Sequence, residues 1–231
     1  GPSASLARPF AETIIAENPY IESYAVARLD NVGQNYVIVG EGNEAVTHAA
    51  YVAEMTLKAF DVFGINILVG SVENIANDNY VAISETAAKR LGVDVDSMIN
   101  IESWGVLYPF TICAIYEDLP IASDLQNIEI IRCNKLETQD LYSSNNWSYN
   151  HFLKLVSSAD KSSIESTMSE KYQEFMSEQI AAYCKYKGVS ADSEEVKYVK
   201  ENDFGPKNQE YMVTDPIDDY IKDGGVVRVA P

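Results

Sequence analysis

The sequence has few of the side chains that most catalytic and metal-binding sites use. It contains two histidines, His48 and His151, and three cysteines, Cys113, Cys133 and Cys184, with no CxxC spacing. GxSxG and HExxH are absent, so neither a nucleophile with a histidine base nor a zinc site is indicated. The phosphate-binding patterns GxxxxGKS/T and GxGxxG are absent as well. We therefore expect no catalytic residues, no metal, no cofactor and no ATP binding.

Basic residues are also scarce, since 17 Lys and Arg stand against 35 Asp and Glu, for a formal net charge of -18. This balance excludes a nucleic-acid partner, because phosphate binding needs clustered Lys and Arg, and it disfavours docking on anionic lipid headgroups. The negative net charge can serve in two ways: it can keep the protein soluble, or it can attract a basic partner. No apolar run reaches the roughly 18 residues of a membrane helix, so we expect no span within this sequence.

Three further polar features have structural interpretations. An oxidising compartment would allow one disulfide, for example Cys133 to Cys184, but the sequence does not establish it. Residues 74–79 are rich in Asn and Asp but lack the Gly and Glu of an EF-hand, which favours a surface loop over a calcium site. Glu117 and Asp118 are adjacent on an extended segment and point to opposite sides, so they are not a glycosidase pair.

The sequence does contain the pattern of a folded α+β domain. Its hydrophobic fraction of 46% and aromatic fraction of 10% are those of a globular chain. Short helices are expected at 10–17 and 190–199, and 45–53 is ambiguous between strand and helix. Apolar or alternating runs bounded by turns predict strands at 24–29, 36–39, 65–70, 80–83, 109–116, 127–132, 149–156 and 211–214.

The strongest helix signal covers residues 162–187. Ser162–Glu165 reads as a capping box, and Gly188 ends the pattern. Apolar side chains recur at steps of three and four residues, so we expect a stripe packed on a sheet, with a partner-binding groove as the alternative. The stripe consists of Ile164, Met168, Tyr172, Phe175, Met176, Ile180 and Tyr183.

The segment 81–123 carries the most informative local signals. Ser84 is placed to cap the start of a short helix, and Gly92 to cap its end in the left-handed conformation. Asp118 is suited to fixing the turn that Leu119 and Pro120 begin. We predict structural roles for Ser84, Gly92, Asp118 and Pro120, and the sequence identifies no partner-binding residue.

This segment resembles the extracytoplasmic core domain of MacB/FtsX-type ABC transporter permeases. The family has the phrase Ser-Glu-x-x-Ala-x-x-Leu-Gly after a strand, and a later strand that ends in Asp-Phe-Pro-x-x-Ser. Here Leu119 stands at the Phe position and Ala114 replaces a common Gly. The matching positions are Ser84, Glu85, Ala88, Leu91, Gly92, Ile112, Ala114, Ile115, Asp118, Leu119, Pro120 and Ser123.

The resemblance implies a two-lobed α+β fold. Residues 1–74 and 147–231 would form a discontinuous, porter-like, membrane-proximal lobe, and residues 75–146 an inserted distal lobe. Because both chain ends would return to the membrane, we expect Ala7–Phe10 and Val226–Ala230 to lie close together.

The resemblance also implies a function without catalysis in this chain. The domain would lie in the periplasm as part of an inner-membrane permease, and would couple cytoplasmic ATP hydrolysis to export, lipoprotein handling or signalling. Its partners would be a cytoplasmic ATPase subunit or domain, a periplasmic adaptor or cargo protein, and a second permease copy in a dimer. The alternative is a stand-alone extracytoplasmic ligand-binding or adhesion module.

Overall fold

The computed structural model of the chain describes residues 15, 18–77, 79–120, 125–133, 149–156, 160–202, 212–214 and 226–230. Strands and helices are both abundant, so the α+β prediction is confirmed. The strands are β1 (Ile21–Val39), β2 (Val46–Met55), β3 (Ile67–Gly70), β4 (Tyr80–Ser84), β5 (Met98–Ser103), β6 (Val106–Tyr116), β7 (Ile130–Arg132), β8 (Asn150–Leu155), β9 (Met212–Thr214) and β10 (Val226–Ala230). The helices are η1 (Gly42–Glu44), α2 (Ala59–Val62), α3 (Glu85–Leu91), α5 (Lys161–Lys187) and α6 (Glu194–Asn202).

Strand β1 is one continuous strand of 19 residues, where the sequence predicted two strands joined by a turn at 30–35. Its first part pairs with β8 and its last part with β2 and β5. The register against β2 shifts between Arg28 and Gly33, which pair with Glu54 and Val52. The polar residues of the expected turn are therefore accommodated as a bulge, which bends a strand without reversing it.

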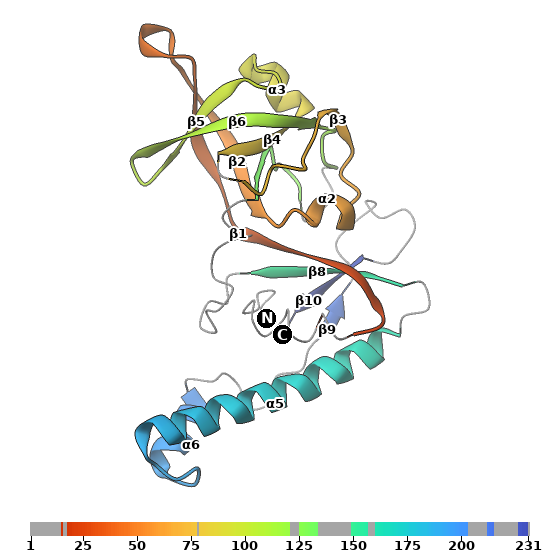
Figure 1. Cartoon of the computed structure of the whole chain (residues 1–231), viewed down its shortest axis with the longest axis vertical. Coiled ribbons are helices and arrows are strands. Elements are labelled where there is room, and N and C mark those ends of the chain that lie inside the picture. Colours follow the sequence, from red (N-terminus) through yellow and green to blue (C-terminus); the bar gives the residue numbers. More distant parts are fainter. Residues whose placement is uncertain are drawn as a thin grey trace.

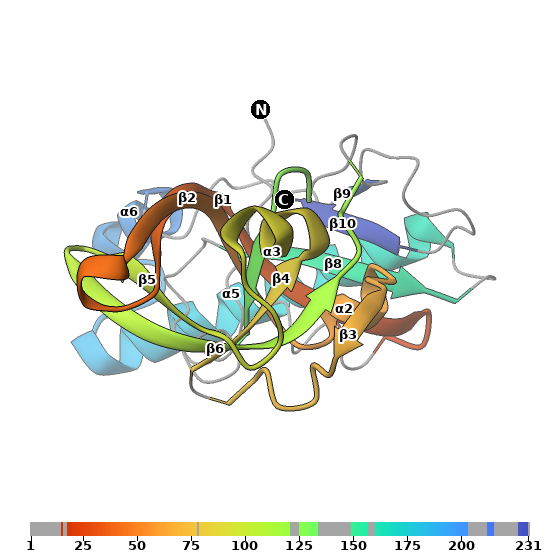
Figure 2. The same ribbon diagram turned by 90° about the horizontal axis from the view of Figure 1, so that it is seen from above.

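The pairings of the upper half in Figure 1 close on themselves in the cycle β1–β2–β7–β4–β6–β5–β1, which we call the strand ring. The ring has an apolar interior, and α3 covers one of its ends (Figures 1 and 2). Alternate residues of each strand face inward, as closure of a sheet requires. The interior comprises Val37, Ala50, Val52, Val81, Ile83, Ile99, Ile101, Phe110, Ile112 and Ile130, with Ala87, Ala88 and Leu91 from α3.

A second apolar core lies outside the ring and joins it to β8. It contains α2, the outward side chains of β2, β4 and β6, and Phe152 of β8. The rings of Phe63 and Phe152 meet edge to face, with centroids 4.8 Å apart, a favoured aromatic geometry. The ambiguous stretch 45–53 belongs to strand β2, because its partners β1 and β7 flank it on both sides.

Charged side chains gather where β1 passes from β8 to the strand ring. Glu54 lies between two arginines, 3.2 Å from Arg28 Nη1 and 4.0 Å from Arg132 Nη1. Each arginine also stacks on an aromatic ring, Arg28 on Tyr149 at 5.2 Å and Arg132 on Phe110 at 4.6 Å. Burial lowers the pKa of Arg132, and the charge of Glu54 opposes that shift. These contacts tie β1, β2 and β7 together at the uncapped end of the ring.

The lower half consists of β8, β10 and β9 with α5 along them (Figure 1). The predicted capping box at Ser162 is wrong, because Asp160 is the N-cap and its carboxylate accepts a hydrogen bond from the Ser162 amide at 3.1 Å. An aspartate at this position also suits the positive end of the helix dipole. Gly188 ends the helix with φ of 68°.

The stripe of α5 packs over part of its length. Ile164 and Met168 are fully buried, whereas Tyr186 in the last turn is 85% exposed. The far half of α5 extends past the sheet in Figure 1, and α6 folds back on it through a hydrogen bond of 2.7 Å from Tyr183 to Glu195. The side chains of the middle of the stripe lie outside the described residues.

The two-lobe division stays a prediction. Strands β2 and β3, from the segment assigned to the membrane-proximal lobe, pair with β7 and β6 of the segment 75–146. The predicted strand 127–132 is shorter, because Asn127 has a positive φ of 66° and β7 begins at Ile130. Ala7–Phe10 lies outside the described residues, as does the predicted helix 10–17 apart from Ile15.

Two further findings bear on the sequence predictions. None of the three cysteines forms a disulfide, so the bridge from Cys133 to Cys184 is absent, and Cys133 is instead fully buried in the core against α2. Among the helices that the structure describes, none combines the length and the apolar character needed to cross a bilayer.

Gly70, at the end of β3, supplies a stability test. Its φ is +83°, and a Cβ there would lie 2.2 Å from the Cys113 carbonyl oxygen. We expect Gly70→Ala to lower the free energy of unfolding by about 3 kcal/mol, because left-handed strain and a backbone clash add. Urea denaturation measures the loss. The control Gly64→Ala has φ of +61° with no heavy atom within 4 Å, and should cost about 1 kcal/mol. Equal losses would show that the close approach of β3 to β6 is unimportant.

Candidate partner-binding groove

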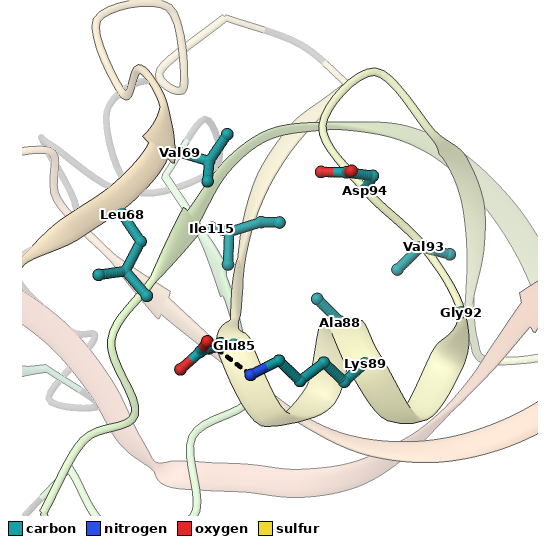
Figure 3. A pocket seen from close by; sticks show the side chains of 9 residues that line it. All are labelled: Leu68, Val69, Glu85, Ala88, Lys89, Gly92, Val93, Asp94 and Ile115. Atoms are coloured by element: carbon teal, nitrogen blue, oxygen red, sulfur yellow. Dashed lines mark hydrogen bonds and ion pairs between the residues drawn. The ribbon is translucent and has the colours of Figure 1, made fainter.

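An apolar groove of about 350 Å³ lies between α3 and β3. Figure 3 shows Leu68 and Val69 of β3 on one side of the cavity and Ala88 of α3 facing them, with Ile115 of β6 between. The other lining residues are Glu85, Lys89, Gly92, Val93 and Asp94. The cavity is thus an apolar surface with charged groups at its rim.

Strand β3 forms the exposed wall of this groove. It pairs with β6 on one side, and no other strand in the described parts of the chain pairs with it. Leu68 and Val69 are 43% and 50% exposed. A short, unpaired edge with apolar side chains is a surface on which another chain can dock.

Charged side chains form the rim of the groove. Glu85 and Lys89 form an ion pair of 2.6 Å one helical turn apart, drawn in Figure 3. The exposed carboxylate of Asp94 lies across the cavity from this pair (Figure 3). Because the ion pair is exposed, it orients the side chains and contributes little to stability.

The start of α3 is fixed by two oxygen acceptors. The Oγ of Ser84 accepts from the Ala87 amide at 3.3 Å, and Oδ1 of Asp118 accepts from the Thr86 amide at 3.0 Å. The Thr86 hydroxyl also donates to the other carboxylate oxygen of Asp118. Two amides that a helix start would leave unsatisfied are therefore bonded, one of them by a residue 32 positions away.

These contacts determine the charge state of Asp118. Slight burial raises its pKa, but the hydrogen bonds from Thr86, with contributions from Ser84 and Lys89, outweigh that effect and lower the pKa below 3.8. A carboxylate that accepts hydrogen bonds is stabilised in its charged form. Asp118 therefore stays ionised and holds the end of β6 against the start of α3.

The opposite side of α3 borders a second cavity, of about 390 Å³. Arg90 donates to the Ala49 carbonyl at 3.2 Å and to Glu129 at 2.5 Å, and Glu129 accepts from the Tyr51 amide at 2.9 Å. The helix is thus anchored to β2 as well as to β6. The cavity is lined by Tyr51, Ser84, Thr86, Asp118, Leu119, Asn127, Ile128 and Glu129.

The groove region is suited to binding an apolar segment. The residues that line the two cavities include no histidine or cysteine, and the hydroxyls of Ser84 and Thr86 are engaged in hydrogen bonds. Burial raises the pKa of nearby Cys113 to about 11, so its thiol is protonated at neutral pH. No group of three metal-ligating side chains occurs in the portion of the chain with described coordinates.

The structure brings two of the four predicted structural residues together. Ser84 and Asp118 meet at the start of α3, while Gly92, with φ of 69° and ψ of 36°, ends the helix and lines the groove. Asp118 accepts hydrogen bonds from Thr86 at the start of α3, and its predicted role in the turn at Leu119 and Pro120 stays a prediction. Pro120 is exposed and is followed by residues outside the description.

Sequence reasoning missed three features of this region. The first is Thr86 as a hydrogen-bond donor. A hydroxyl residue in the first turn of a helix is only a weak sign of such a contact. The bridge from Arg90 to Glu129 joins residues 39 apart, and no local pattern encodes it. Leu68 and Val69 read as an ordinary apolar strand, and their exposure depends on which strands pair.

Several solved structures resemble this chain, and two of them are informative. A domain of a protein described as a permease, from Porphyromonas gingivalis, gives a TM-score of 0.62 at 20% identity, covering 75% of this chain and 77% of that one. The periplasmic region of MacB from Actinobacillus actinomycetemcomitans gives 0.52 at 16% identity, covering 85% of this chain and 83% of that one. The chain has the MacB-type periplasmic fold. Neither a family profile nor a curated protein matches the sequence. The similarity to the two solved structures therefore establishes the MacB-type fold but not an activity.

The pH dependence of stability tests the role of Asp118 in this MacB-type fold. We expect Asp118→Ala to cost about 1 to 2 kcal/mol at pH 7, because hydrogen bonds to the start of α3 are lost. Because the pKa of Asp118 is lower in the folded protein than its ordinary value of 3.8, its carboxylate stabilises the fold fully above pH 3.8. This stabilisation is lost as the pH falls through the pKa of the folded state. The difference from wild type should therefore shrink below pH 3.8.

Thermal unfolding at a series of pH values measures this difference. The control is Glu73→Ala, which removes an exposed carboxylate from the loop before β4. It should change the melting temperature little at any pH. A difference between Asp118→Ala and wild type that stays constant down to pH 2 would contradict the assignment.

Proposed function

We propose that this chain is an extracytoplasmic domain of an ABC transporter permease, and that membrane segments of the permease hold it at the inner membrane. In this proposal a cytoplasmic ATPase subunit or domain hydrolyses ATP, and the domain passes the resulting movement to export, lipoprotein handling or signalling outside the membrane. The domain has no catalytic role of its own. A periplasmic adaptor or cargo protein meets it there, and the full-length permease acts as a dimer.

The single observation that carries the proposal is the fold likeness to the periplasmic region of MacB, over 85% of this chain. A share of this size extends beyond the strand ring, so the likeness is not limited to one common motif. The net charge of -18 disfavours contact of the domain with anionic lipid headgroups. The sequence has no phosphate-binding loop, which agrees with ATP hydrolysis by a separate subunit or domain.

Strand β1 is a suitable element for the coupling step. It takes part in the sheet of the lower half through β8 and in the strand ring through β2 and β5. A continuous, hydrogen-bonded strand transmits displacement as a rigid element, whereas a flexible linker would absorb it. The charged contacts of Glu54 with Arg28 and Arg132 lie at the junction.

Nucleotide binding provides the first test. We expect the purified domain to show no saturable binding of ATP by calorimetry up to millimolar concentrations, because the chain lacks a phosphate-binding loop. The full-length gene product should co-purify from membranes with an ATPase, and ATP hydrolysis should require that ATPase. Binding of ATP to the isolated domain, or a full-length product that is recovered without a membrane segment, would overturn the proposal.

The junction provides a second test. We expect Glu54→Gln to lower the free energy of unfolding by about 2 to 4 kcal/mol, because two arginines in a partly buried site lose the charge between them. In the assembled transporter the variant should lower the transport obtained per ATP hydrolysed. Urea denaturation and paired transport and ATPase assays measure both effects, with Glu73→Gln as the control. A transporter that keeps full coupling would show that the junction has no part in it.

The groove supports a second candidate, a stand-alone ligand-binding module. Its volume of about 350 Å³ is at the lower end of the range for small-molecule sites. This alternative predicts that a medium-chain fatty acid raises the melting temperature of the domain, and that Leu68→Asp abolishes the shift. The permease proposal predicts no such shift.

A further inference from the structure

The β5–β6 hairpin ends in a two-stranded arm, residues 102–109. The last pair between β1 and β5 is Val37 with Ile101, and β4 begins to pair with β6 at Thr111. Between these points β5 and β6 pair with each other, and no neighbouring strand of the described chain pairs with either. The yellow-green arm projects from the strand ring in both Figure 1 and Figure 2.

The tip of the arm holds a tryptophan in an unfavourable backbone conformation. Trp104 and Gly105 have φ of 55° and 76°, and they form a two-residue turn that prefers Asn or Gly at both positions. Within the described parts of the chain, the other non-glycine residues with positive φ are Asn79, Asp96 and Asn127, whose side chains tolerate this region. Trp104 therefore weakens the turn, which makes a role outside folding the better explanation for its presence.

The arm also exposes more apolar surface than folding requires. Trp104 is fully exposed, at 101%, and Val106, Leu107 and Tyr108 are 51%, 52% and 45% exposed. A single exposed apolar residue is ordinary, but four within five positions form a patch. Trp and Tyr are the residues that most often supply the binding energy at protein interfaces.

The net charge of the domain indicates the chemistry of the partner. Between Arg90 and Arg132 the sequence contains no Lys, Arg or His, while Asp94, Asp96 and Glu102 lie on or before β5. The exposed Glu41 and Glu44 of the β1–β2 hairpin lie beyond the opposite end of β5, because Val39 pairs with Ile99. Beside the arm, Glu102 lies two residues before Trp104, and the Arg132 guanidinium stacks on Phe110 and pairs with Glu54. The local charge is therefore mixed, and the net charge of -18 is what favours a basic partner.

We infer that the β5–β6 arm inserts Trp104 into an apolar pocket, rimmed by Lys and Arg, on a second protein. Opposite charges around an apolar anchor speed association and select the partner. A second copy of this chain is disfavoured, because each copy carries a net charge of -18. An anionic membrane surface is disfavoured for the same reason. The inference goes beyond the transport role, and it holds whether or not the chain works within a permease.

Photo-crosslinking tests this inference in the full-length protein. A benzoyl-phenylalanine at position 104 should form one main adduct with a protein whose contact site is basic, and the adduct should disappear when Leu107→Asp is added. The control position is Asn43, which is also exposed and lies on the β1–β2 hairpin. An adduct consisting of two copies of this chain, or no protein adduct, overturns the inference. So does an equal adduct from Asn43.

Affinity measurements with the purified cross-linked protein form the second step. Trp104→Ala should weaken the Kd by about 30-fold or more, as the loss of an interface anchor does. Tyr186→Ala, which changes a residue 85% exposed on α5, should leave the Kd within a factor of two or so. Raising the salt concentration should weaken binding by wild type. Equal affinity of Trp104→Ala and wild type overturns the inference.

Two further measurements test whether Trp104 has a structural role or binds a membrane instead of a protein. Trp104→Asn should raise the melting temperature, because Asn suits the turn, while it abolishes binding. A lowered melting temperature would mean that Trp104 has a structural role, and would overturn the inference. Sedimentation with phosphatidylethanolamine–phosphatidylglycerol vesicles should leave the domain in solution, and Trp104-dependent binding to the vesicles would also overturn it. A failed ATPase association would reject the permease proposal and leave these outcomes unchanged.

Discussion

The dual pairing of β1 is the constraint on which the rest of the structure depends. Before the bulge, Ala25 and Ala27 face the core against α2, and after it Val37 faces the interior of the strand ring. From Arg28 to Gly33 the β1 chain advances by five residues, while its partner β2 advances by two, from Glu54 to Val52. The difference is an odd number, so odd-numbered residues of β1 point to one face of the sheet before the bulge and to the other face after it. In a strand a shift of one residue exchanges the two faces. One strand can therefore serve two cores that lie on opposite sides of it.

The closed strand ring explains why polar contacts concentrate at its ends. Inside the ring, the strands satisfy one another's backbone groups and the side chains are apolar. At one end α3 closes the ring, held by Asp118 on one side and by Arg90 with Glu129 on the other. At the other end Glu54 joins Arg28 and Arg132. Each end pairs its charges, because an isolated charge beside an apolar interior would be costly.

Local signals in the sequence predicted local structure, and failed where distant contacts decide. The Ser84 cap, the left-handed Gly92 and the end of α5 at Gly188 depend on neighbours within a few residues. The turn expected at 30–35 became a bulge because β2 pairs with β1 on both sides of it. The bonds from Thr86 to Asp118 were not predicted, since they form only because β6 pairs parallel to β4 and thereby ends beside the helix start. The groove could not be predicted, because the exposure of β3 depends on the whole strand order.

The same pairing indicates where the two halves can move relative to each other. Every strand of the ring is hydrogen-bonded to two ring neighbours, so the ring resists deformation more than the junction does. Bending costs the fewest hydrogen bonds at the bulge of β1, where the ladder to β2 is interrupted between Arg28 and Gly33. The ion pair from Arg28 to Glu54 and the contact of Phe63 with Phe152 cross this region and oppose the bend. In the proposed coupling, a force at the arm therefore reaches β8 and α5 through β1, and the strength of these two contacts determines how much of it is lost to bending.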